Sequence, residues 1–538
     1  MNTTGLKLVF EMSLLAGLVL LPFASIAKTK EKVKSVDETP QDVDVFTALI
    51  PQVGGGIQWE VMDRFRLLKE HGASEVMFSR YLAYEQQVDS QIETNGPVAT
   101  YSATHWDWRR KDFDPEYLKV KSLPIRVRAP FEGDCTWVVD GRKPTLGACA
   151  YFEISSCNIT TGCSVQVTSH EQTPIIETIH PRHLIVATLG DSYASGEGVP
   201  DIRNEFSARD LNPKHTKSFW LDRKCHRSLY SGHALAALTY TMLDAHAAVS
   251  YVSYACSGAL LRDGLIGSYS GAEPVIPGSV SSQLDLLTHI LDGRRADFLT
   301  FSFGGNDVGF AEIVKATFLG RRAPLDKLFV AVPDKIAELD SLVTKYVPQL
   351  VALSANVLVM DYPTPTVFGR DGEYSNLARV DAAIRGDQCQ ADWRTGERFV
   401  PRVLARFLRF FRLGVDAAKL KQLETQVATP LREFVKSVAK KLTDGGATVD
   451  FVPLDEEFRL HGYCAPVLTP EDSGRWINTA LDSFRLEGFL NVSGAMHPNI
   501  RGQDAIAKGI LTKILEKQCA ALKGDSLMGK ICDEGSVW

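Results

Sequence analysis

The chain has 538 residues, of which 45% are hydrophobic and 23% charged, so it is an ordinary globular sequence with room for two or three domains and a sizeable core. Its formal net charge is -6, and both signs are mixed along the chain without a long block of Lys and Arg. These features argue against nucleic acid as a partner.

Residues 1–27 have the organisation of a signal peptide. Lys7 precedes an apolar run from Met12 to Phe23, and the small residues Ser25 and Ala27 follow, where a signal peptidase would cut. The run is about 12 residues long, short of the ~20 that a spanning helix needs. We therefore expect a secreted or periplasmic protein, with an uncleaved membrane anchor as the alternative.

Ten cysteines, an even number, follow this leader. In an exported chain they favour disulfides over reactive thiols. The spacings of Cys149, Cys157 and Cys163, with no clustered histidine, do not resemble those of a zinc site. We expect no metal and no organic cofactor.

Residues 28–117 are predicted to be a linker followed by a helical region. Positions 28–45 are rich in charge and lack apolar periodicity, which is typical of a flexible lead-in. From Trp59 to Gln87, apolar residues recur near helical spacing, which predicts one or two helices broken at Gly72. The recurring residues are Val61, Phe65, Leu68, Val76, Leu82 and Tyr84.

Residues 118–182 are predicted to form a small all-β module, because apolar residues alternate with polar ones in short runs separated by Gly, Pro and Asn. Two disulfides would stabilise it, with three pairings open among its four cysteines. The grouping of Cys135, Trp137 and Cys149 is similar to that of immunoglobulin-like domains. The four cysteines are Cys135, Cys149, Cys157 and Cys163.

From residue 183 to residue 523, short apolar runs alternate with long helical segments, which predicts an α/β domain with a parallel sheet covered on both faces. A tail, residues 524–538, follows. The candidate strands are Leu184–Leu189, Val249–Tyr254, Phe298–Phe303, Asn356–Asp361 and Thr448–Val452.

Two segments, Gly309–Leu350 and Phe368–Gly414, are longer than crossovers require and are interpreted as insertions near the mouth of the site. The second contains a predicted helix, Phe399–Gly414, with an apolar face flanked by arginines. Such a face suits peripheral contact with a membrane surface or a role as a lid. Packing against the protein's own core is the favoured alternative.

Four short motifs follow predicted strands or precede a helix, and together they provide the groups that ester hydrolysis requires. Ser192, in a Gly-Asp-Ser turn after the first strand, is the candidate nucleophile. The backbone N–H groups of Ser192 and Gly258 and the side-chain amide of Asn306 are the candidate oxyanion hole. His497, just before the last helix, is the candidate base.

These motifs, in this order, resemble the four sequence blocks of the SGNH (GDSL-type) hydrolases, a family of esterases and lipases. The resemblance covers roughly Leu184 to Leu522 and implies a three-layer, flavodoxin-like α/β fold. Cys225 to Ser228 (CHRS) and Ala255 to Ala259 (ACSGA) are most similar to the motifs of actinobacterial secreted lipases. The literal GDSL string that contains Ser526 follows a helical segment and is interpreted as a surface turn.

One position departs from the family. Most members have an Asp three residues before the histidine, where this chain has Gly494. The resemblance implies that a main-chain oxygen, that of Gly494, orients the imidazole, with Asp482 or Glu487 as side-chain alternatives. It also implies disulfides between Cys225 and Cys256 and between Cys389 and Cys464, which leaves Cys519 and Cys532 as a third pair.

The sequence thus predicts a secreted serine ester hydrolase of the lipase or esterase type, with a Ser-His dyad or triad. Its substrate is either an acyl lipid or an acylated glycan, the latter making it an O-acetyl esterase of surface or cell-wall polysaccharides. A non-catalytic secreted binding protein is the alternative of another class. Oligomeric state and acyl length do not follow from the sequence.

Overall fold

The computed structural model describes most of the chain between residues 56 and 532, and the signal peptide, the helix predicted at Phe399–Gly414, Cys389, Cys464 and Ser526 lie outside the described residues. The described ranges are 56–70, 72–86, 104–107, 109–169, 172–202, 218–273, 275–318, 322–363, 422–459, 461–462, 475–478, 480–487, 491, 493–522, 527 and 531–532.

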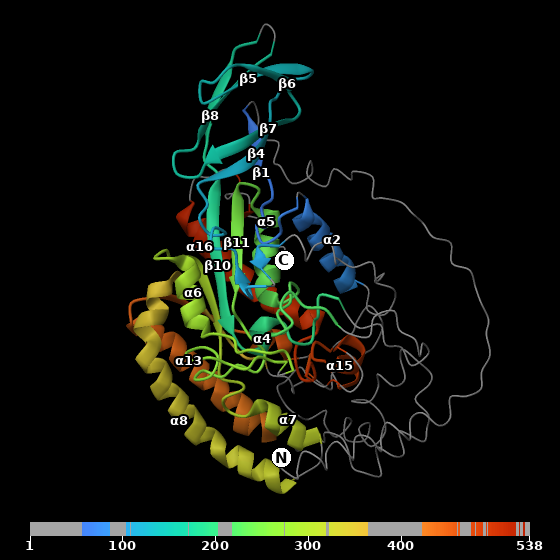
Figure 1. Ribbon diagram of the computed structural model, residues 1–538, viewed down its shortest axis with the longest axis vertical. Helices are drawn as coiled ribbons and strands as arrows, with labels where there is room; N and C mark the ends of the chain where they lie inside the picture. Colours follow the sequence, from blue (N-terminus) through green and yellow to red (C-terminus); the bar gives the residue numbers. More distant parts are fainter. Residues whose placement is uncertain are drawn as a thin grey trace, which may run out of the picture. The chain divides into compact units, whose positions relative to one another are not determined.

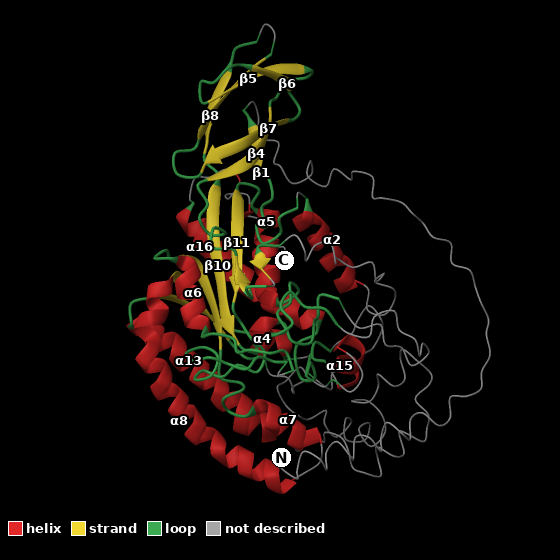
Figure 2. Ribbon diagram, in the orientation of Figure 1, coloured by secondary structure: helices red, strands yellow, loops and turns green. Residues whose placement is uncertain are grey.

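A five-stranded parallel sheet forms the centre of the larger region (Figures 1 and 2). Its strand order, β11-β10-β12-β13-β14, is that of flavodoxin-like folds. All five strands coincide with predicted runs, and the expected α/β fold class is confirmed. The strands are β10 (Arg182–Gly190), β11 (Ala247–Ser253), β12 (Ala296–Ser302), β13 (Ser354–Met360) and β14 (Thr448–Val452).

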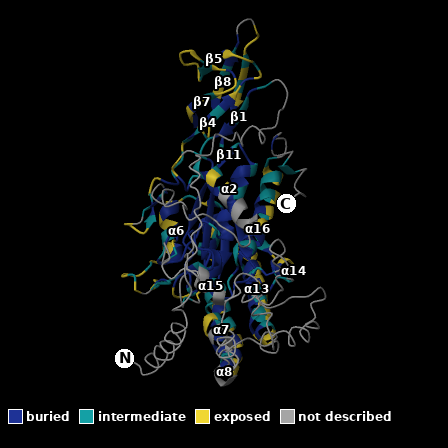
Figure 3. Cartoon of the chain, turned by 90° about the vertical axis from the view of Figure 1, so that its right-hand side faces the viewer, coloured by how far each residue is buried: buried dark blue, intermediate teal, exposed yellow. Residues whose placement is uncertain are grey.

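Helices cover both faces of this sheet, which explains why its strands read as nearly continuous apolar runs. On one face α5 (Gly232–Leu243) packs against α16 (Ile500–Ala521), and on the other α6 (Gln283–Leu291) and α13 (Thr429–Asp444) pack against α8 (Arg322–Leu353) (Figure 1). All seven residues of β11 are buried, and Figure 3 shows this central region as almost uniformly buried. The sheet is therefore enclosed, with functional groups confined to the loops at its ends.

The predicted insertion at Gly309–Leu350 is helical and consists of α7 (Phe310–Phe318) and most of α8. Shorter elements complete the described part of the domain: the π-helix η2 (Glu424–Ala428), α14 (Asp455–Phe458) and α15 (Ala480–Glu487). Within the described residues, every helix is too short or too polar to cross a bilayer.

The small β module contains two antiparallel sheets, in the orders β1-β4-β7 and β6-β5-β8-β9. Disulfides Cys135–Cys149 and Cys157–Cys163 settle which of the three possible pairings is present. Trp137 stacks on Phe152 in the core, with ring centroids 5.1 Å apart. The strands are β1 (Gln58–Val61), β4 (Ser122–Arg128), β5 (Asp134–Val139), β6 (Thr145–Ala148), β7 (Phe152–Asn158), β8 (Cys163–Thr168) and β9 (Ile175–Ile179).

The helical prediction for Trp59–Gln87 is correct only after Gly72. Helix α2 (Ala73–Gln86) follows that glycine, whereas Gln58–Val61 is strand β1, paired antiparallel with β4. Tertiary pairing with a distant strand decided the conformation of this short segment over its local spacing. Downstream, β2 (Trp106–Asp107) and β3 (Asp112–Phe113) form a two-stranded ladder.

The β module contacts the end of the parallel sheet where the strands begin, here called its amino edge; the end where the strands finish is its carboxyl edge. The ring of Trp59 stacks on His246, which immediately precedes β11, at a centroid distance of 3.8 Å. The N–H of Val61 donates to the carbonyl of Ala245 at 2.8 Å. The opposite, carboxyl edge is where the four sequence motifs meet.

Candidate active site

The nucleophile candidate lies at the carboxyl end of β10, at the start of the short helix α4 (Ser192–Ser195). Asp191 caps this helix, and its Oδ1 accepts from the N–H of Tyr193 at 3.1 Å. As a first-turn residue, Ser192 has a backbone N–H that the helix itself does not use. Its side chain is buried apart from 6% of its surface. The turn thus presents both a hydroxyl and an N–H at one point.

The structure brings Ser192 and His497 together although 305 positions separate them, with Nε2 of His497 2.7 Å from Oγ of Ser192. His497 precedes α16, whose N-cap Asn499 accepts from the N–H groups of Arg501 and Gly502. Burial lowers the pKa of His497, so the ring is neutral at neutral pH. A neutral imidazole in contact with a serine hydroxyl is placed to act as a base.

The other ring nitrogen of His497 faces a main-chain oxygen. Nδ1 lies 3.2 Å from the carbonyl oxygen of Ala495, so the predicted kind of acceptor is present but one residue further along the chain. The carbonyl of Gly494 instead accepts from the backbone N–H of His497 at 3.2 Å. An Nδ1–H donated to Ala495 leaves Nε2 free to accept the serine proton.

Neither carboxylate considered as the alternative orienter hydrogen-bonds to the ring in the described structure. Asp482 pairs with Arg475 at 2.8 Å. Glu487 contacts the loop that carries His497 and accepts from the N–H groups of Gly198 and Gly494, at 3.0 and 3.1 Å. Glu487 therefore joins the nucleophile's loop to the histidine's loop without contacting the imidazole.

Gly258 and Asn306 lie at the ends of the neighbouring strands. Gly258 has a φ of +79°, and a Cβ there would come within 2.3 Å of the Tyr269 hydroxyl, so only glycine fits. Asn306 donates from Nδ2 to the carbonyl of Ala259 at 3.2 Å, which uses one of its two amide hydrogens. The second hydrogen can face a bound carbonyl oxygen.

A pocket of about 400 Å3, solvent-open space included, adjoins Ser192 and Asn306. One side is polar and belongs to the strand ends, while the other is apolar and comes from α7, η2, α13 and Pro363, which follows β13. The apolar lining consists of Phe310, Pro363, Val427, Ala428 and Leu431. A hydrocarbon chain attached to a carbonyl at Ser192 would therefore find an apolar wall.

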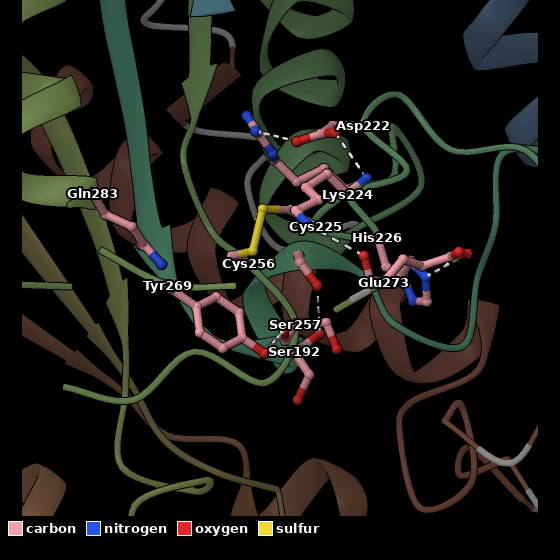
Figure 4. Close-up of a disulfide and its surroundings, with 12 residues drawn as sticks. Ser192, Asp222, Lys224, Cys225, His226, Cys256, Ser257, Tyr269, Glu273 and Gln283 are labelled. Atoms are coloured by element: carbon pink, nitrogen blue, oxygen red, sulfur yellow. Dashed lines mark hydrogen bonds and ion pairs between the residues drawn. A yellow bond between two sulfur atoms is a disulfide. The ribbon is translucent and has the colours of Figure 1, made fainter. Parts of the chain in front are cut away.

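The disulfide Cys225–Cys256 is present, and Figure 4 shows it close to Ser192. The N–H of Ser257 donates to the carbonyl of Cys225, and the N–H of Cys256 donates to the carbonyl of Gly190, both at 3.0 Å. The disulfide thus joins the loop of Cys225 to the turn that carries Gly258, and the hydrogen bond from Cys256 to Gly190 joins that turn to the one that carries Ser192. A second disulfide, Cys519–Cys532, joins the end of α16 to the tail.

A buried ionic cluster that was not predicted from the sequence lies under the site. Nδ1 of His226 is 2.8 Å from Oε2 of Glu197, and Glu273 is near its other nitrogen. Burial opposes the charge of His226, but the attraction of Glu197 outweighs it and raises the pKa of His226 to about 10. Burial likewise opposes the charge of Glu197, yet His226 lowers the pKa of Glu197 to about 2. Both residues are therefore charged at neutral pH.

The sequence signal for this cluster is the CHRS motif, which contains His226 and resembles a motif of actinobacterial secreted lipases. Within the described ranges, no group of three or more His, Cys, Asp and Glu side chains is arranged to hold a metal ion. The described site thus consists of a serine, a histidine, hydrogen-bond donors and a buried ion pair.

No family model matches the chain, and no curated protein matches it. Among solved structures it is similar to an extracellular lipase from Streptomyces rimosus, with 19% identity, 62% of this chain and 99% of that chain covered, and a TM-score of 0.36. For phospholipase A1 from Streptomyces albidoflavus the identity is 17%, the coverage 62% and 98%, and the TM-score 0.34.

A family two carbohydrate esterase from Clostridium thermocellum is also similar, with 13% identity, 74% of this chain and 93% of that chain covered, and a TM-score of 0.27. At such TM-scores these likenesses carry no functional argument. The function of this chain is therefore inferred from the geometry of its own site.

Proposed function

We propose that the chain is an SGNH-type serine hydrolase that cleaves carboxylic esters. The observation that carries this proposal is the 2.7 Å contact between Ser192 Oγ and His497 Nε2, at an edge of the sheet where Gly258 and Asn306 also lie. A nucleophile, a base oriented by a third group and convergent N–H donors are the components of acyl transfer.

In the proposed reaction, Oγ of Ser192 attacks the ester carbonyl carbon while Nε2 of His497 takes the hydroxyl proton. The negative charge on the carbonyl oxygen is stabilised by the N–H groups of Ser192 and Gly258 and by Nδ2 of Asn306. The tetrahedral intermediate then breaks its bond to the alcohol, which leaves with the proton from Nε2. Water, deprotonated by His497, releases the acid and regenerates Ser192.

The imidazolium formed in each half of this reaction is oriented by a carbonyl instead of a carboxylate. The carbonyl of Ala495 accepts from Nδ1, so we propose a Ser-His dyad with a main-chain orienter. Asp482→Asn tests this directly, because its carboxylate is already paired with Arg475. We expect a change in kcat of less than about threefold, whereas loss of a true triad carboxylate lowers kcat by roughly 10⁴.

The substrate is proposed to be an ester of an apolar acyl group, which the apolar side of the pocket supports. Deacetylation of a surface or wall glycan is the second candidate, since the module beside the catalytic domain could face a polymer. Comparing p-nitrophenyl esters of increasing length with an acetylated polysaccharide separates them. Rates that rise with chain length favour the lipid, and rates confined to acetyl groups favour the glycan.

We further propose that the protein is exported. The disulfides of the described residues are compatible with an oxidising compartment, and the leader supplies the route. Contact with a membrane surface through Phe399–Gly414 remains part of this proposal. Sedimentation with phospholipid vesicles, with and without that segment's arginines, measures it.

The decisive experiment is labelling with a fluorophosphonate, which reacts with an activated serine. We expect the label on Ser192, no label on Ser192→Ala, and a loss of ester turnover in proportion to the fraction of Ser192 that is labelled. Folded protein that neither labels nor hydrolyses any ester would overturn the proposal and support a non-catalytic binding protein.

A further inference from the structure

Tyr362 occupies an unusual place in the site. It follows β13 in the turn Asp361–Pro363, it is 6% exposed, and it lines the pocket together with Ser192 and Asn306. Its hydroxyl donates to Oδ2 of Asp191 and accepts from the N–H of Gly305 at 3.1 Å. One hydroxyl therefore bridges the carboxyl ends of β10, β12 and β13.

The two groups bridged by Tyr362 directly precede two groups of the proposed machinery. Asp191 precedes the nucleophile Ser192, and Gly305 precedes the oxyanion donor Asn306. The approach is close, because a Cβ on Gly305 would lie 3.1 Å from the Tyr362 ring and 3.4 Å from Oδ2 of Asp191. The hydroxyl thus links the turn that carries the nucleophile to the turn that carries the donor.

Both carboxylate oxygens of Asp191 accept hydrogen bonds from groups of the protein. Its Oδ1 is used by the Tyr193 N–H and its Oδ2 by Tyr362. Burial raises the pKa of Asp191 to about 7, because the charged carboxylate loses its hydration. The hydrogen bond from Tyr362 to the second oxygen offsets part of this cost of burying the charge. Asp191 is therefore an anchor for the bridge.

We propose that Tyr362 is a positioning residue, whose hydroxyl sets the distance between Ser192 and the amide of Asn306. The inference rests on the proposed ester hydrolysis. In that reaction the donor must meet the oxygen as it becomes an anion, so a small displacement affects the transition state more than substrate binding.

The test is Tyr362→Phe, which keeps the ring and removes the hydroxyl. We expect kcat for a p-nitrophenyl ester to fall about 10- to 100-fold, the scale of a displacement of about 1 Å, with KM within about threefold. Rates are expressed per Ser192 labelled by fluorophosphonate, so that misfolded protein is not counted.

The matched control is Tyr240→Phe. Tyr240 also donates to a buried aspartate, Asp244, at 2.7 Å, but this pair precedes β11 and lies at the amino edge of the sheet. We expect its kcat to equal that of the wild type. Equal losses of kcat in both variants would show a general structural effect and overturn the inference.

A double-mutant cycle with Asn306→Ala separates positioning from other roles. If Tyr362 acts through the Asn306 turn, Tyr362→Phe should lower kcat by less than about threefold once the amide is absent, since coupled residues are not additive. A full additional loss, or a Tyr362→Phe variant as fast as the wild type, would overturn the inference alone. A wild type with no Ser192-dependent hydrolysis would instead overturn the proposed function and the inference with it.

Discussion

The β module and the parallel sheet differ in where they bury polar groups. Among described residues of the module's strands and connecting turns, the buried polar or charged side chains are Glu60 and Ser169. Around Ser192 they are numerous: Asp191, Ser195, Glu197, His226, Ser257 and Glu487 are among them. Buried polar groups are retained at a cost in desolvation. Their concentration at one edge of the sheet marks where chemistry is expected.

The two regions also meet at the edge away from the site. The module contacts Ala245 and His246 before β11, whereas Ser192 and Gly258 follow the opposite ends of their strands. We therefore expect changes at the carboxyl edge to alter rates and changes in the module to alter stability. A folded module variant that slows the reaction would contradict this division.

The largest effect is expected at the oxyanion hole. Asn306→Ala removes a donor to the developing negative charge, so kcat should fall about 10²- to 10³-fold with little change in KM. The control is Asn356→Ala, near the amino end of β13. It removes a similar hydrogen bond, from the side-chain amide to the carbonyl of Asp297 at 2.9 Å. Steady-state kinetics on one ester compares them, and similar losses in both variants would contradict the division.

The next effect concerns the module alone. Replacing Cys135 and Cys149 by serine opens a disulfide with a sequence separation of 14, which should lower the free energy of unfolding by about 3 kcal/mol. Denaturant unfolding of the whole chain measures this loss, while kcat at a temperature where the variant is folded should be unchanged. A large loss of kcat in folded protein would mean that the module contributes to the site.

A smaller effect on kcat is expected from Glu487, which links the loop of Ser192 to the loop of His497. Glu487→Ala removes the acceptor of the Gly198 N–H and one of the two acceptors of the Gly494 N–H, which also donates to Ser483, so we expect a loss of about 2 kcal/mol in stability and a reduced kcat. Glu487→Gln should be milder, because burial raises the pKa of Glu487 well above its usual value and a neutral group is tolerated there. If the alanine variant lost stability but kept its full kcat, Glu487 would not position His497.

The strands of the sheet were predictable because β10 to β14 are buried on both faces and read as apolar runs. Strand β1 was not, because Gln58–Val61 owes its conformation to pairing with β4 far along the chain. Local spacing contains no information about such a partner. The helical periodicity assigned to Val61 and Phe65 was therefore wrong, while that after Gly72 was correct.

For the site, too, the sequence predicts some features and leaves others undetermined. The sequence predicts Ser192, Gly258 and Asn306 as site residues because each belongs to a recognisable motif just after a predicted strand. The choice between the carbonyls of Gly494 and Ala495 depends on how a tight loop folds, which the residue types do not determine. For the proposed role of Tyr362 the sequence does hold a signal, since Tyr362 lies two residues after β13 at the carboxyl edge, where a polar side chain can reach the ends of neighbouring strands.

The subtlest expected effect is on the pH dependence of the reaction. His497 acts as a base only when neutral, and burial lowers its pKa below its ordinary 6.5, so kcat/KM should decline only at more acidic pH. The charge of Glu197 opposes this lowering, because a nearby anion favours the imidazolium. Removing that charge in Glu197→Gln should therefore move the acidic limb of the pH profile of kcat/KM to still lower pH.

The measurement is kcat/KM between about pH 4 and 8, which reports ionisations of the free enzyme. Glu60→Gln, which alters a buried carboxylate of the module that pairs with Arg126 at 3.0 Å, is the control and should leave the limb in place. A limb that moves to higher pH in Glu197→Gln would mean that Glu197 acts mainly through His226, whose charge it stabilises and which lowers the pKa of His497, and not through direct attraction to His497. A limb that moves in Glu60→Gln would place the module within electrostatic reach of the site, contrary to the separation of the two regions.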